Sequence, residues 1–335
     1  MAYLPTLTDY AGLIINLFSH FNQDCQNQRT KHGRPLTYTQ DSFIIFFTIM
    51  QYRGLYTFKS QRRWLHQHPQ ALRTLGWSRP PHRTTISRRY KSLYALIQRF
   101  IVFVSQWVSD MDRRFSLNHL VEDKSLFKAR GPLWHQRHRR QGVIPDGLRN
   151  LDTDASWSKS SYHGWVYGYA VHATCNEDAF PVIVSVETAS VSESAVLDNK
   201  EELILNELCP MTLCADNAYT KAMRIRRWAK QEVALLTPAL RWLKGRYAEA
   251  YHRFIKLSGP AERLRRRRTS VEPLFDLTSR VIGSDKHHKQ LAMRGLDNVR
   301  SCLALAVLSV QIAMIANSIW GLSHRNISKM AAAFQ

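Results

Sequence analysis

A hairpin pattern near the middle of the chain limits most strongly what this sequence can fold into. Large side chains occupy every second position at the start of residues 164–174: Trp165, Tyr167, Tyr169 and Val171. The residues CNEDA follow as a turn, and the apolar run FPVIVSVETAS comes next. Alternation beside a short polar turn is typical of two antiparallel strands. The sequence therefore predicts a β-hairpin across residues 164–190.

Two more predicted strands each carry an acid. Residues 119–129, HLVEDKSLFKA, favour one strand with Asp123 near its centre. Residues 211–215 favour a short buried strand, and Asp216 stands at its carboxyl end. In α/β sheets that end faces the ligand crevice, so an acid there is a catalytic candidate. The alternative for Asp216 is a helix N-cap, a common position for aspartate.

A third acid, Glu272, lies in the stretch RRRRTSVEPLFDLTSR at residues 265–280. As a helix, this stretch would turn one face toward a core: Val271, Leu274, Phe275, Thr278 and Ile282. Glu272 would sit at the edge of that face, one turn after Arg268. A carboxylate among guanidiniums suits a group that holds a metal against a phosphate. The alternative is a surface Arg–Glu pair worth roughly a few tenths of a kcal/mol.

Composition points to a polyanionic partner. The chain has 335 residues, enough for about two domains, and a formal charge of +21. Nucleic acid is the first candidate for such a field. The five cysteines are odd in number and include no CxxC, which favours reduced thiols in a cytoplasmic protein over a zinc site. The apolar residues 302–322 are interrupted by polar ones and favour a buried helix over a membrane span.

The N-terminal third has a helical and basic pattern. Residues 5–20 and 39–52 carry apolar residues at helical spacing. Near residues 72–95, two prolines end one helix and Thr84 or Thr85 can cap the next. Basic residues follow on its first turns: Arg88, Arg89 and Lys91. This is the outline of a helix-turn-helix that binds a major groove. An amphipathic helix with a solvated basic face has the same pattern.

The order strand, hairpin, helix, strand with a terminal Asp, and helix with Glu is that of a ribonuclease-H-like fold, a mixed sheet flanked by helices. The acids are 93 (216−123) and 56 (272−216) residues apart, so only a fold could assemble them. The pieces VEDKSLFKARGPLWH, LDTDASW…GWVYGYAVH, LCADNAYT and RTSVEPLF resemble a DDE transposase of bacterial insertion sequences. Together they span Leu120 to about Arg280.

The resemblance implies a role for each acid. Asp123 matches the first acid in Asp-x-Ser/Thr, Asp216 the second in Ala-Asp-x-x-Tyr, and Glu272 the third in Arg-x-x-x-Glu. Asp152 and Asp154 are rivals for the first acid, because LDTDASW could itself be the first strand.

This sequence also departs from the family pattern at three positions. Arg265 replaces a tyrosine, and Ser279 replaces a lysine, with Arg280 beside it. Pro273 directly follows Glu272; it fits a helix that begins near residue 269 or 270 and would kink a longer one.

The activity that the resemblance implies is cleavage of transposon ends and joining of the 3′-hydroxyl to target DNA. Asp123, Asp216 and Glu272 would hold two Mg²⁺ or Mn²⁺ ions. Phosphate contacts would come from basic residues: Arg265, Arg266, Arg267, Arg268 and Arg280. A homodimer is expected, because two DNA ends must be brought together. The alternatives are a metal-dependent nuclease that does not join DNA and an inactive DNA-binding descendant of a transposase.

The expected domains follow from these assignments. Residues 1–115 would form an all-helical DNA-binding domain, and residues 116–285 the RNase-H-like catalytic domain. Residues 286–335 would form a helical segment packed on that core.

Overall fold

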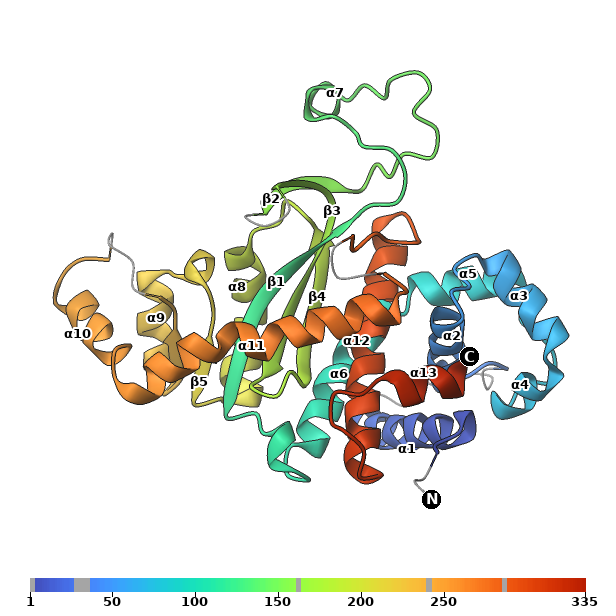
Figure 1. Ribbon diagram of the computed structural model, residues 1–335, viewed down its shortest axis with the longest axis horizontal. Helices are drawn as coiled ribbons and strands as arrows, with labels where there is room; N and C mark the ends of the chain where they lie inside the picture. The colour runs from blue at the N-terminus through green and yellow to red at the C-terminus, as the bar shows by residue number, and fades with distance from the viewer. Residues whose placement is uncertain (1–3, 27–36, 161–163, 239–242, 285–287) are drawn as a thin grey trace.

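The computed structural model describes residues 4–26, 37–160, 164–238, 243–284 and 288–335. These form a mixed α/β structure in which a six-stranded sheet is flanked by helices (Figure 1). The strands are β1 (His119–Lys128), β2 (Ser156–Ser160), β3 (Gly164–Asn176), β4 (Pro181–Thr188), β5 (Thr212–Cys214) and β6 (Ala234–Leu236).

The sheet combines antiparallel and parallel pairing. Its main path runs β2-β3-β1-β5-β6, and β4 pairs with β3 as well. β3 is antiparallel to β1, β2 and β4, whereas β5 is parallel to both β1 and β6. The predicted hairpin is confirmed as β3 and β4, and the strand expected around Asp123 is confirmed as β1. β3 is buried along nearly its whole length, which suits a strand covered on both faces of the sheet.

Helices cover both faces of β1. Neighbouring residues in a strand point to opposite faces. Glu122 bonds to Lys200 on α8 (Glu193–Leu203), while Asp123 bonds to Arg267 on α11 (Ser258–Val281). The two helices therefore lie on opposite sides of the sheet, and α11 covers the face that carries Asp123. Figure 1 shows α11 as one long helix that crosses the strands.

α11 extends further toward its N-terminus than the sequence indicates. It begins at Ser258, so Pro273 lies inside the helix, and of the two cases considered for this proline the longer helix is the one observed. Proline removes one backbone donor there. Two nearby hydroxyls, those of Thr269 and Ser270, bond to the Arg266 carbonyl. The apolar face predicted from residues 271–282 is confirmed, because all five of its residues are buried.

Within the described residues, six α-helices precede the sheet: α1 (Leu7–Gln26), α2 (Gln40–Tyr52), α3 (Phe58–Gln67), α4 (Pro69–Thr74), α5 (Arg83–Lys91) and α6 (Tyr94–Val108). The helices predicted at residues 5–20 and 39–52 are confirmed. The predicted cap of α5 is wrong: the helix begins before Thr84, and the ring of His82 accepts from the Thr84 N–H. A histidine nitrogen here takes the place of a threonine hydroxyl.

The apolar helix α12 (Leu296–Ile319) occupies the centre of the molecule. It packs on β4, α6, α11 and α2, and so joins the sheet to the N-terminal helices (Figure 1). Among the described residues it is the one helix long and apolar enough to cross a membrane, but 89% of its most apolar stretch is buried in the protein. The prediction of a buried helix is confirmed.

The remaining short elements complete the chain. They are the 3₁₀ turns η1 (Arg113–Phe115) and η3 (Asn217–Tyr219), the π-helical turn η2 (Ile204–Leu208), and the helices α7 (Gln136–Arg140), α9 (Ala222–Ala229), α10 (Arg246–Phe254) and α13 (Ser328–Phe334). The basic insert that contains α7 stands away from the sheet in Figure 1.

Candidate functional site

The parallel pairing of β1 and β5 places Asp123 and Asp216 side by side. The last pair in this ladder is Val121 with Cys214. Asp123 lies two residues further along β1, and Asp216 lies two residues beyond Cys214, just past the end of the parallel strand β5. Burial raises the pKa of Asp123 to about 6, and the charge of Asp216 acts in the same direction. The structure thus brings together two of the three predicted acids.

Asp216 also acts as an N-cap, the alternative role considered for it. Its Oδ1 atom accepts a hydrogen bond from the Ala218 N–H at 2.8 Å, and so opens the turn η3. The side chain is half-buried. Capping uses one carboxylate oxygen and is compatible with a second role for the other.

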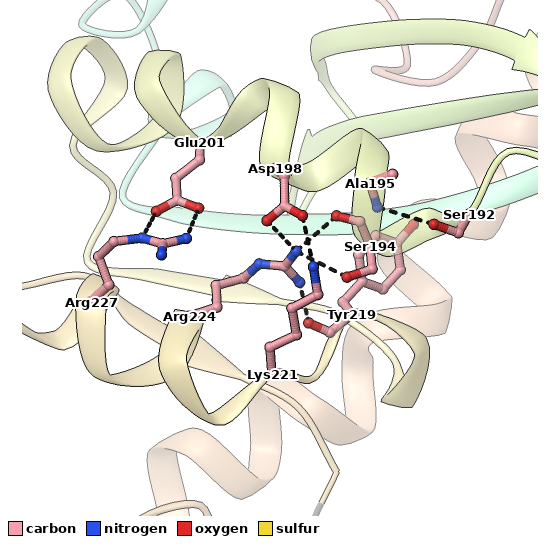
Figure 2. A network of polar contacts seen from close by, with 9 residues as sticks. All are labelled: Ser192, Ser194, Ala195, Asp198, Glu201, Tyr219, Lys221, Arg224 and Arg227. Atoms are coloured by element: carbon pink, nitrogen blue, oxygen red, sulfur yellow. Dashed lines mark hydrogen bonds and ion pairs between the residues drawn. The ribbon is translucent and has the colours of Figure 1, made fainter.

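A network of charged side chains fixes the loop that follows Asp216. Figure 2 shows α9 tied to α8 through arginines and acids. The buried Arg224 guanidinium donates to Asp198 Oδ1 at 2.6 Å and to the Ser194 carbonyl at 2.7 Å, and it also bonds to the Tyr219 carbonyl. Lys221 reaches Asp198 Oδ2 at 2.7 Å. Because the network grips both ends of the 219–221 loop, it positions the chain beside Asp216.

The structure does not bring Glu272 to the two aspartates. Glu272 is exposed on α11. Across the described residues, no three His, Cys, Asp or Glu side chains lie close enough together to form a metal site. In this conformation the acids are a pair on the sheet edge and a third on the covering helix.

An arginine from α11 occupies the space beside Asp123. Arg267 Nη1 lies 2.7 Å from Asp123 Oδ2, and both side chains are largely buried. The other three arginines of the run face outward: Arg265 and Arg266 pair with Glu262, and Arg268 is exposed. Of the four consecutive arginines predicted to contact phosphate, Arg267 is therefore the one that points into the site; the fifth, Arg280, is exposed and pairs with Asp276. Helical spacing accounts for this, because Arg267 shares the buried face with Val271 and Leu274.

Lys289 is a site residue that the sequence did not reveal. Its Nζ atom donates to Ser125 Oγ at 2.6 Å and lies over the rings of Phe127 and Phe275. Burial lowers its pKa, against the opposing charges of Asp276, Glu272 and Asp123. These contacts place the ammonium group beside β1 and α11, near enough to Glu272 and Asp123 for both charges to act on it.

A backbone pairing brings Lys289 to the site. Lys128 at the end of β1 donates to the Lys289 carbonyl at 2.8 Å. Lys289 has a φ of 41°, a conformation that is uncommon outside glycine. The family lysine, expected seven residues after the acid, is Ser279 here; that side chain is buried and bonds to the Phe275 carbonyl. No sequence spacing connects Lys289 with Asp123.

The rival acids Asp152 and Asp154 perform a structural task. Asp152 is buried and accepts from the Tyr169 hydroxyl at 2.8 Å and from the Gly295 N–H at 3.2 Å. Asp154 accepts from the Leu296 N–H at 2.8 Å. Both carboxylates therefore face the first N–H groups of α12, where negative charge is stabilised.

The predicted groove-binding residues lie on α5. Arg88 is exposed and, with Arg83 and Lys59, lines a cavity of about 440 Å³. Arg89 is half-buried over the Phe43 ring, and Lys91 is exposed in the last turn. α5 packs on α3, and eight residues, 75–82, separate it from α4.

Comparisons with known proteins add little to this description. No family model matches the chain, and no curated protein matches it. Among solved structures, it is similar to a chain described as "Crystal structure of a pre-cleavage Mos1 transpososome". The TM-score is 0.21 and the identity 11%, over 92% of this chain and 98% of that one. A similarity of this size carries no argument about fold or function.

Proposed function

We propose that this protein is a metal-dependent DNA transposase with a ribonuclease-H-like core, which cleaves transposon ends and joins the 3′-hydroxyl to target DNA. One observation carries the proposal: Asp123 on β1 and Asp216, just past the end of the parallel strand β5, each follow the last pair of the β1–β5 ladder by two residues. The helix that bears Glu272 packs on the same face. The chain order of these elements agrees with the transposase motifs, and the +21 charge suits a DNA partner.

The donor chemistry of the three acids suits Mg²⁺ or Mn²⁺. Carboxylate oxygens are the ligands these ions prefer. When bound, the ions would activate a water or hydroxyl nucleophile and stabilise the leaving oxygen. Asp123 and Asp216 are near one another, whereas Glu272 would have to approach them. Arg267 would also have to release Asp123, because its guanidinium now neutralises that carboxylate.

Arg267 and Lys289 have a second role in this proposal. Arg267 bonds to Asp123, and Lys289 bonds to Ser125 on the same strand, so both cations would be close to a phosphate bound at Asp123. A guanidinium released from Asp123 can contact two phosphate oxygens at once. Ser279 carries no charge, and the Lys289 ammonium would supply one near Asp123. Without DNA, the two cations would stabilise the largely buried Asp123 carboxylate. With DNA bound, they would contact its phosphate.

The activity can be tested on duplexes made from the DNA that flanks the gene. With Mg²⁺, we expect strand cleavage at one defined position and joined products with a target plasmid. EDTA should abolish both. Cleavage without joining would instead indicate the nuclease, and binding without cleavage would indicate the inactive DNA-binding protein. Separating the products on denaturing gels distinguishes these outcomes.

Replacing Arg267 with methionine should tighten metal binding. A hydrogen bond to a charged group contributes about 1.5–3 kcal/mol. Removing that competitor for Asp123 should improve the apparent Mg²⁺ affinity by roughly 10–100-fold. Isothermal titration of Mg²⁺ into protein without DNA measures this change. Arg266→Met is the matched control, because Arg266 pairs with Glu262 on the outer face of the same helix. Equal affinities in the two variants would contradict competition at Asp123.

A further inference from the structure

A large cavity lies apart from the acids and is lined by arginines. It has a volume of about 1120 Å³. Its walls come from the ends of α2 and α11, the start of α3, residues 290–292 and the segment before α13. Four guanidiniums border it, those of Arg53, Arg130, Arg280 and Arg325, whereas no Asp or Glu side chain is part of its described lining.

Some of these arginines are already engaged outside the cavity. Arg280 pairs with Asp276 at 2.7 Å, one turn back on α11. Arg130 donates to the Ala292 carbonyl at 2.5 Å, and Arg325 to the Asp178 carbonyl at 3.1 Å. Carbonyls neutralise no charge. The cavity therefore keeps a strong positive potential, with Asp276 as the one acid paired to a lining arginine among the described ion pairs.

Polar atoms without partners gather at the α2 side of the cavity. Arg53 lies over the Trp64 ring and has no ion pair within the described part of the chain. Its Nε atom, the Tyr52 hydroxyl and the Gln51 Oε1 atom are buried and lack a hydrogen-bond partner there. Burying such groups unpaired costs free energy. All three residues line the cavity, but these particular atoms are enclosed by protein, so this wall contributes to the cavity through the positive charge of Arg53.

The helix ends at the cavity do not cancel this charge. α2 and α11 both end there, and helix C-termini carry partial negative charge. Their last carbonyls are already bonded, however: Gly54 donates to Gln51, Gly283 to Arg280, and the Tyr56 hydroxyl to Ile282. Because those carbonyls already accept hydrogen bonds, they would repel an anion at the arginines less than free carbonyls would.

The size and lining of the cavity favour a nucleic-acid strand as its ligand over a small molecule. Small-molecule sites are typically about 300–1,000 Å³ and mainly apolar. This cavity is larger and borders four arginines, together with Tyr52 and Tyr56. Cationic grooves with aromatic side chains are typical of single-stranded nucleic-acid binding. Residues 290–292 connect the cavity to Lys289 in the candidate site.

We propose that the arginine-lined cavity binds the phosphodiester backbone of one unpaired DNA strand beside the candidate catalytic site. The inference rests on the proposed function, because strand cleavage and joining would supply such a strand.

Anisotropy of a labelled single-stranded oligonucleotide, without Mg²⁺, tests this site. The double variant Arg53→Gln/Arg325→Gln should bind at least about tenfold more weakly. Losing two phosphate contacts should also reduce the slope of log K against log[salt] by about 1.4 for a single strand. The matched control is Arg99→Gln/Arg113→Gln, which removes the same charge from two exposed arginines outside the cavity. Thermal melting of both variants checks that each is folded.

Several outcomes would overturn the proposal. One is an unchanged salt slope in the cavity variant, and another is an equal loss in the control. A loss as large for duplex as for single strand would show that the site does not select an unpaired strand. Displacement of the oligonucleotide by equimolar inorganic phosphate would show a discrete phosphate site instead. Because no cleavage is measured, an inactive protein would contradict the proposed function and still leave this result interpretable.

Discussion

Asp216→Asn should abolish metal-dependent DNA cleavage while leaving duplex binding nearly intact. Losing a metal ligand removes several kcal/mol of transition-state stabilisation, so we expect cleavage to fall by at least about 1000-fold. The substitution also separates the two roles of this residue. Asparagine caps a helix as well as aspartate does, so the bond to Ala218 can persist. A residue that only capped η3 would therefore tolerate the change.

The measurements are single-turnover cleavage with Mg²⁺ and a gel-shift assay without it. Asn217→Ala is a suitable control, because Asn217 is exposed and is the next residue in the chain. It should retain cleavage within a few-fold of the unmodified protein. Full activity of Asp216→Asn with metal present would rule out the carboxylate mechanism.

Lys200→Met should cause the largest loss of stability outside the apolar core, about 3–5 kcal/mol. Lys200 Nζ lies 2.8 and 2.9 Å from the two Glu122 oxygens and also donates to the His172 carbonyl. Lys200 and Glu122 are almost fully buried. Removing the lysine leaves a carboxylate in the core with only the Thr174 hydroxyl as a described donor.

Urea unfolding measures this loss through the shift of the midpoint. Lys221→Met is the matched control: Lys221 also pairs with an acid but is half-exposed, so its loss should be at most about 1 kcal/mol. The double variant Glu122→Leu/Lys200→Met should recover most of the stability, because it removes both charges. Equal losses in Lys200→Met and Lys221→Met would show that burial does not set the strength of this pair.

Much of the sheet could be predicted because its signals are local. Alternation gave the β3–β4 hairpin, and an apolar run around an acid gave β1. The ends of helices were harder to predict, because each end depends on one or a few individual contacts. His82 caps α5 where Thr84 or Thr85 was expected, and α11 begins at Ser258, 11 residues (269−258) before the earlier of the two starts that would suit Pro273. Proline is tolerated there because packing holds the helix on both sides of it.

In the candidate site, too, some residues could be predicted from local sequence signals and others could not. Sequence motifs identified Asp123 and Asp216, and the strand pairing places them together. Which arginine of the run meets Asp123 depends on the phase of α11, which the apolar face at Val271 and Leu274 sets once the helix is known to extend back to Arg267. Lys289 depends on a pairing between residues 128 and 289, which no local pattern reports. The roles of all these residues in catalysis remain predictions.

The position of α12 has a consequence for how such a protein would measure its substrate. Because this helix packs against both the sheet and α2, no flexible tether separates α5 from Asp123. A duplex bound at α5 would therefore reach the acids at a fixed number of base pairs from its binding site on α5. Lengthening the end sequence by half a helical turn would move the scissile bond to the wrong side of the duplex.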